Sequence, residues 1–193
     1  NPDDDSEKRI DLTKALRNDL DKHNRDSYNV VAFTHVDHDH IAGSSDFFHL
    51  RHAEKYQGDD RVKINTMWVP AAAILEESQS GDARVVRQEA RHRLKAGEGI
   101  RVFSTPGRLD DWLEEQGIDP SDRRHLFVDA GESIPDFNLS EDGFEVFVHS
   151  PHATRSNDGE LINRNDDALG FQATFLKGGA RHACTSSQTW ATR

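Results

Sequence analysis

The chain has little cysteine, no long apolar segment and fewer basic than acidic residues. Its single cysteine, Cys184, excludes an intramolecular disulfide, so we expect a cytoplasmic protein, although bacterial secreted proteins also often lack disulfides. No run approaches the ~18 apolar residues of a membrane span, and we expect no membrane partner. The 35 acidic and 24 basic residues give a formal charge of -11, which disfavours nucleic acid as a partner without excluding it.

The pattern of apolar residues predicts alternating strands and helices. With 193 residues, 34% of them hydrophobic, we expect one domain over residues 1–193. Strands are expected near residues 29–33, 67–69, 100–103, 126–128, 145–148, 169–176 and 182–185. Helices are expected near 6–23, around Phe47, Phe48 and Leu50, over 71–95 with a break at Ser80-Gly81, and over 109–116. The alternation favours an α/β layered fold.

The most informative segment is residues 33–43, Phe-Thr-His-Val-Asp-His-Asp-His-Ile-Ala-Gly. Within six positions it contains four potential metal ligands, which are His35, Asp37, Asp39 and His40. Imidazole and carboxylate groups are the usual zinc ligands outside thiolate sites. The segment comes directly after a predicted strand, and α/β proteins place their sites at the carboxyl ends of strands. The pattern therefore predicts a metal site at this position.

Side-chain direction decides whether these ligands converge. If the backbone stays extended, alternate side chains face the same way, so His35, Asp37 and Asp39 would share one cleft. His40 would then reach a second metal, and two metals could hold and activate a shared water. The alternative is a solvated polar turn whose acids cap the next helix.

The segment also resembles a known motif. His35-Val-Asp37-His-Asp39-His40-Ile-Ala-Gly43 is similar to the His-x-His-x-Asp-His signature of the metallo-β-lactamase superfamily, with Asp37 in place of the second His. This His-x-Asp-x-Asp-His form, together with a Gly-rich helix start after it, resembles the hydrolase domains of bacterial competence proteins. The resemblance implies an αββα sandwich, a usually dinuclear zinc site, and hydrolysis of an ester, amide, phosphodiester or related bond by a zinc-bound hydroxide.

The resemblance also implies a role for each ligand. His35 and Asp37 would bind the first zinc and Asp39 and His40 the second, with Asp39 also positioning the catalytic water. A later His at a strand end completes the first site in this superfamily, and His149, which comes directly after residues 145–148, is the candidate. His152 is the weaker alternative, and a surface His that only makes a hydrogen bond is the other interpretation of His149.

Two features depart from the family pattern. Ser187 stands where a bridging Asp is expected, and a neutral hydroxyl is a poor bridge between two cations. The family's final His has no counterpart before Arg193, and its opening β-hairpins have none either. We therefore expect a partial metallo-β-lactamase αββα sandwich, incomplete at both ends.

Two functions remain open on this basis. The first is a hydrolase that uses one or two zinc ions on a small-molecule or phosphodiester substrate, which includes lactones and β-lactams. The second is a binding module that keeps the fold but is catalytically weakened or inactive. A third hypothesis is a homo-oligomer that supplies the missing strands.

Several residues outside the motif receive structural interpretations. We expect a solvated helix face from Arg84, Arg87, Arg91 and Arg93, because acids flank them. Cys184 is expected to be buried in a strand, and the tryptophans are expected to be core or interface residues. His49 and His52 lie close to the motif in sequence, and either is a candidate to orient a metal ligand from behind.

Overall fold

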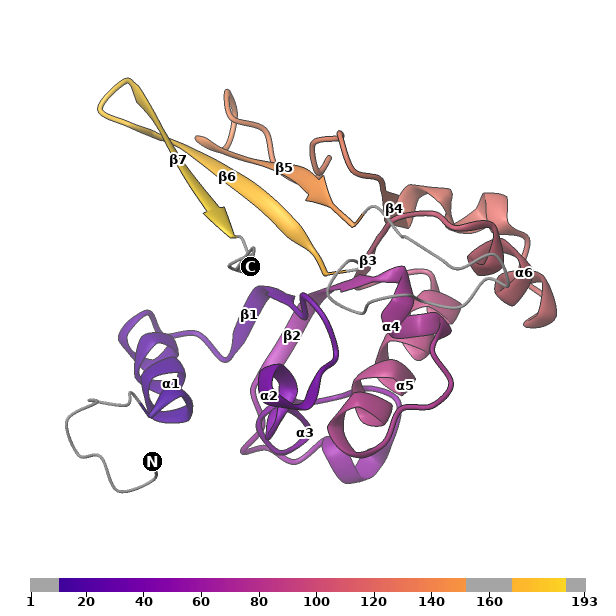
Figure 1. Ribbon diagram of the computed structural model, residues 1–193. Helices are drawn as coiled ribbons and strands as arrows, with labels where there is room; N and C mark the ends of the chain where they lie inside the picture. Colours follow the sequence, from indigo (N-terminus) through magenta and orange to yellow (C-terminus); the bar gives the residue numbers. More distant parts are fainter. Residues whose placement is uncertain (1–10, 152–167, 187–193) are drawn as a thin grey trace, which may run out of the picture.

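The computed structural model describes residues 11–151 and 168–186 of the chain (Figure 1). The helices are α1 (Leu12–Lys22), α2 (His38–Ile41), α3 (Ser44–Phe47), α4 (Ala71–Leu75), α5 (Gly81–Ala96) and α6 (Gly107–Glu115), with 3-10 turns η1 (Glu54–Tyr56) and η2 (Pro120–Leu126). The strands are β1 (Ser27–Ala32), β2 (Lys63–Pro70), β3 (Ile100–Phe103), β4 (Phe127–Val128), β5 (Phe144–Ser150), β6 (Gly170–Lys177) and β7 (Ala180–Ser186).

The first four strands form a parallel sheet in the order β1-β2-β3-β4. Each connection between neighbouring strands contains helices, which is how parallel strands are joined. The sheet is largely buried because its central strands are mostly apolar on both faces; all four residues of β3 are buried, and three of them are apolar. The carboxyl ends of these strands lie at one edge, where the segment after β1 begins.

The last three strands form an antiparallel sheet in the order β5-β6-β7. One hydrophobic core lies between the parallel sheet and its helices and includes Met67 and Val69 of β2. A second core includes Trp68, also of β2, together with Val146 and Val148 of β5. Alternate residues of β2 therefore face opposite cores, and the parallel sheet lies between a helical layer and the antiparallel sheet, as Figure 1 shows.

The mixed α/β architecture confirms the predicted fold class at this coarse level. Strand β3 has the predicted bounds, and residues 76–80 separate α4 from α5, as the break at Ser80-Gly81 predicted. The helix around Phe47 is shorter than expected, because Phe48 leaves it to pair with Val62 in a parallel bridge. None of the helices in residues 11–151 and 168–186 is long and apolar enough to cross a membrane.

Two predictions about side-chain burial are wrong. Arg87 and Arg93 are buried in α5 rather than solvated, since their guanidinium groups donate to carbonyl oxygens of other elements. Cys184 is exposed rather than buried, because β7 is the edge strand of the antiparallel sheet.

Candidate metal site

The segment directly after β1 is held from two sides. The backbone N–H of Phe33 donates to the carbonyl of Trp68 in the neighbouring strand, at 2.9 Å. The backbone N–H of Leu169, just before β6, donates to the carbonyl of Thr34 at 2.8 Å. The segment therefore lies where the carboxyl end of the parallel sheet meets the antiparallel sheet.

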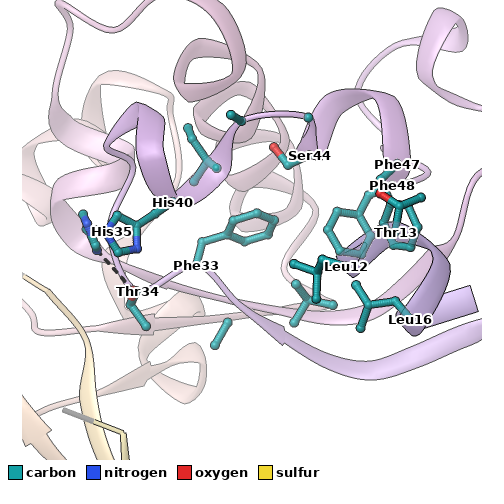
Figure 2. A pocket seen from close by; sticks show the side chains of 15 residues that line it. Leu12, Thr13, Leu16, Phe33, Thr34, His35, His40, Ser44, Phe47 and Phe48 are labelled. Carbon is teal, nitrogen blue, oxygen red and sulfur yellow. Dashed lines mark hydrogen bonds between the residues drawn. The ribbon is translucent and has the colours of Figure 1, made fainter. Parts of the chain in front are cut away.

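His35, Asp37 and His40 lie together in this segment. The His35 ring is 5% exposed, and its Nδ1 lies 3.2 Å from the hydroxyl oxygen of Thr34. The rings of His35 and His40 are in contact, with centroids 3.8 Å apart and planes tilted by 55° (Figure 2). Nε2 of His35 lies 3.9 Å from Oδ2 of Asp37. All four ligands predicted in this segment thus come from one short turn, and the described side chains of three of them lie together.

The backbone differs from the predicted extended form after Asp37. Asp37 has extended dihedral angles and precedes α2, which runs from His38 to Ile41. The backbone N–H of His40 donates to the carbonyl of Asp37 at 3.0 Å, which closes this turn. Alternation of side-chain direction therefore ends at Asp37. Asp39 lies within α2, and its side chain is outside the described part of the structure.

The donor atoms of His35 and Asp37 are of the elements that zinc binds, and the distance between them is close to the one that zinc requires. Two ligands of a tetrahedral zinc with bonds of 2.0–2.1 Å lie about 3.3 Å apart, whereas these two atoms are 3.9 Å apart. A shift of roughly half an ångström would let both atoms bind one ion. Within the described residues, however, no group of three or more His, Cys, Asp or Glu side chains is placed to hold a metal.

Of the later candidate ligands, only His149 lies within the described residues, and it belongs to no group of metal ligands there. His149 lies near the end of β5 with an exposed side chain, and its ring contacts that of Phe147, with centroids 5.1 Å apart. The pairing of β5 with β6 is irregular between Val148 and Ser150, and the role of His149 as a ligand stays a prediction. His152 and Ser187 lie outside the described residues.

Asp82 fixes the turn between α2 and α3. Its Oδ2 accepts a 2.7 Å hydrogen bond from the backbone N–H of Gly43, and its Oδ1 accepts one from the hydroxyl of Ser45. Gly43 has a φ of +83°, in the left-handed region that favours glycine. The first turn of α5 thus holds the chain directly after His40. No sequence pattern indicated this contact, because 39 residues separate Asp82 from Gly43.

A pocket of about 360 Å³ lies beside His35 and His40. In Figure 2 the two imidazoles lie at one end, while aromatic and aliphatic side chains from β1, α3 and α1 surround the rest. Ser44 lines the pocket, and its buried hydroxyl has no hydrogen-bond partner in the described part of the chain. The apolar lining includes Leu12, Leu16, Phe33, Phe47 and Phe48. Such a pocket, mostly apolar with few polar groups, is typical of ligand sites.

His52 does not support the candidate metal site. Its backbone N–H and its Nδ1 both lie 3.0 Å from Oε2 of Glu89 in α5, and its ring packs on Tyr56. Residues 49–53 are not helical, and the interactions of His52 are with Glu89 and Tyr56 rather than with His35, Asp37 or His40.

Comparisons with models of known protein families, with curated protein sequences and with solved structures found no match to this chain.

Proposed function

We propose that this protein is a zinc-dependent hydrolase built on a metallo-β-lactamase-like sandwich. The observation that carries the proposal is the grouping of His35, Asp37 and His40 in one turn at the carboxyl end of β1, beside a pocket large enough for a substrate. Sites of α/β proteins lie at this edge of the sheet. The residues are those that the resemblance to the superfamily motif identifies.

The layer order supports the same fold. A parallel sheet is stacked on an antiparallel sheet, and helices cover the outer face of the first. This order corresponds to three successive layers of an αββα sandwich. The hydrogen bond between Leu169 and Thr34 joins the start of β6 to the ligand segment, so both sheets contribute to its surroundings.

His35 and Asp37 would hold one zinc ion, and Asp39 and His40 a second. Zinc supplies a water of lowered pKa, and so a nucleophile at neutral pH, together with a positive charge that polarises the bond to be cleaved. The hydroxyl of Thr34 lies 3.2 Å from Nδ1 of His35, so Nε2, which lies 3.9 Å from Oδ2 of Asp37, is the ring nitrogen that would bind the metal. Asp39 would accept a hydrogen bond from the attacking water and so orient it. The substrate is a small molecule or a phosphodiester.

A second candidate function is a binding module without hydrolytic activity. The observation that favours it is the mostly apolar lining of the pocket beside His35, which suits retention of an apolar ligand. In such a module the two imidazoles at one end of the pocket would contact the ligand directly rather than through a metal.

Metal content and turnover together separate the two functions. Purified protein would be analysed for zinc per chain and assayed with bis(4-nitrophenyl) phosphate and with a chromogenic β-lactam. The hydrolase predicts one or two zinc ions and measurable turnover on one of these substrates. Asp39→Ala should abolish turnover, and His35→Ala should also reduce zinc content. The matched control is His125→Ala, since His125 is an exposed histidine far along the chain from the motif.

Each function predicts a distinct outcome. Zinc that is bound but gives no turnover on any phosphodiester or lactam would favour the binding module. A chain that takes up no zinc, or whose zinc content is the same in His35→Ala as in the unchanged protein, would refute the proposed site.

A further inference from the structure

We infer that the chain has a second ligand site, which binds the phosphate group of a small phosphorylated molecule in a pocket between α5 and α6. The pocket has a volume of about 290 Å³ and shares no lining residue with the pocket beside His35. The inference does not depend on the proposed zinc site. It rests on the chemistry of the lining, on the charge of α5 and on the way two side chains are held.

Every side chain that lines this pocket carries N–H donors, and none of these described residues is a carboxylate. Two are cations, two are imidazoles, two are amides and one is an indole. They are Arg91, Lys95, His52, His92, Gln88, Gln116 and Trp112. Phosphate oxygens accept hydrogen bonds and carry negative charge, so they match this lining.

The charge of α5 contrasts with that of the whole chain. The helix contains five basic residues against Asp82 and Glu89, a formal charge of +3 in a chain of -11. Gln88, Arg91, His92 and Lys95 follow one another at helical spacing, so they lie on one face of its last two turns. A positive face on an acidic protein concentrates anions at this place.

Arg91 is held in a fixed position at the pocket. Its Nε donates to the carbonyl of Ile74 at 2.8 Å, and its Nη2 donates to Glu77 at 2.6 Å. Its guanidinium carbon lies 5.3 Å from the centroid of the Trp112 ring, and Nζ of Lys95 lies 5.7 Å from the same centroid. Among the described residues Nη1 of Arg91 has no hydrogen-bond partner. Two cations are therefore held over one buried ring, with donors left for a ligand.

His52 is oriented by a buried carboxylate. Oε2 of Glu89 lies 3.0 Å from Nδ1 of His52, and Glu89 is fully buried. Nδ1 is therefore engaged, and Nε2 is the ring nitrogen that remains for a ligand in the pocket. The other carboxylate oxygen, Oε1, accepts from Nε of Arg93 at 2.6 Å. This arrangement fixes the imidazole before any ligand arrives.

The form of the site favours a small ligand over nucleic acid. Small-ligand pockets measure roughly 300–1,000 Å³, and this one, at about 290 Å³, lies just below the lower limit of that range, so it suits a small ligand. Single-stranded nucleic acid is bound in grooves that track several phosphates and that offer aromatic faces for base stacking. Here the side chains of Arg91 and Lys95 both lie against the Trp112 ring. The ring face is therefore already covered and is not open to a nucleic-acid base.

The test is calorimetric titration of the full chain with inorganic pyrophosphate at low salt. We expect saturable binding of one pyrophosphate per chain. Lys95→Gln and Arg91→Gln should each weaken it about tenfold, as expected for loss of one charge-assisted contact. Arg84→Gln is the matched control, because Arg84 is exposed on the same helix and does not line the pocket. Addition of pyrophosphate should also shift the Nε2 resonance of His52 in a nitrogen-15 NMR spectrum.

Lys95→Gln is the decisive variant, because Lys95 is exposed and its replacement leaves the helix intact. Thermal unfolding measured by circular dichroism would verify that each variant is folded.

The inference is overturned if pyrophosphate does not bind, if Lys95→Gln binds it as tightly as the unchanged protein, or if a deoxythymidine oligonucleotide binds and pyrophosphate does not displace it. Pyrophosphate also chelates zinc, so binding must persist in His35→Ala treated with EDTA. Loss of binding there would assign the signal to the metal site instead.

Discussion

Oε1 of Glu89 lies 2.6 Å from Nε of Arg93, one helical turn further along α5, and both side chains are buried. Arg93 also donates to the carbonyls of Ile64, Asn65 and Gly99, at 3.1, 3.2 and 2.8 Å. The pair therefore joins α5 to the beginning of two strands of the parallel sheet. A buried charge needs such partners, because leaving one unpaired costs several kcal/mol.

The first prediction concerns the acid stability of this pair. Burial alone would raise the pKa of Glu89, but hydrogen bonds from His52 and Arg93 outweigh it and lower the pKa to about 2. The carboxylate thus contributes stability that is complete above its unfolded pKa of about 4.5 and is lost as the pH falls toward 2. Glu89→Gln should lower the free energy of unfolding at pH 7 by about 3 kcal/mol.

Urea denaturation at several pH values measures this effect. The difference between Glu89→Gln and the unchanged protein should shrink as the pH falls from about 4.5 to about 2, because the unfolded chain binds a proton at Glu89 before the folded chain does. Glu98→Gln is the control, since Glu98 is 74% exposed and its pairing with Arg51 is weak. A difference that stays constant over this range would contradict the role of Glu89.

Burial of Arg93 marks a limit of prediction from sequence. The strand over 100–103 and the break before α5 could be predicted, because apolar runs and glycine act locally. The burial of Arg93 could not be predicted, because the carbonyl groups that accept its hydrogen bonds belong to residues outside α5, both before and after it in the chain. Flanking charges suggested a solvated face, but tertiary contacts decided otherwise.

The second prediction concerns the contact that holds the motif. Asp82→Ala removes the acceptor for the Gly43 N–H, so the turn after α2 should open more often. We expect amide hydrogen exchange at Gly43 to accelerate and the free energy of unfolding to fall by about 1 kcal/mol. Asp46→Ala is the control, because Asp46 is an exposed acid in the neighbouring helix α3. Unchanged exchange at Gly43 in Asp82→Ala would refute this role.

The third prediction concerns the core between the two sheets. Trp68 is 3% exposed and makes edge contacts with Phe103, Phe137 and Phe171, at centroid distances of 5.5, 6.0 and 5.9 Å. Trp68→Ala should lower the free energy of unfolding by about 3–5 kcal/mol. Leu176→Ala, at an exposed position of β6, should change it by less than about 0.5 kcal/mol. Equal effects of the two substitutions in chemical denaturation would mean that the sheets do not pack as described.

The fourth prediction concerns Cys184. Its thiol is exposed on the edge strand β7, so it should react completely with 5,5'-dithiobis(2-nitrobenzoate) without denaturant. Absorbance at equilibrium should correspond to one thiol per chain, the number that the sequence contains. A thiol that reacts only after unfolding in urea would show that this edge is covered in solution.

The candidate site was predictable in its residues but not in its geometry. The ligand types and their spacing identify residues 35–40 from the sequence, and three of them do lie together. The switch from extended backbone to helix at His38 changes the direction of the later side chains, and a short polar run does not reveal it. Asp82 and Leu169, which hold the segment, come from distant parts of the chain and carry no local signal.

The hydrogen bond between Leu169 and Thr34 also has a consequence for the order of biosynthesis. Ribosomes add roughly 5–20 residues per second, so Leu169 emerges after Thr34 by on the order of ten seconds. Until then the carbonyl of Thr34 has no partner from the antiparallel sheet. The nascent chain therefore contains residues 33–43 well before Leu169 is available to donate to Thr34, and this segment acquires its finished surroundings only after residue 169 has been made.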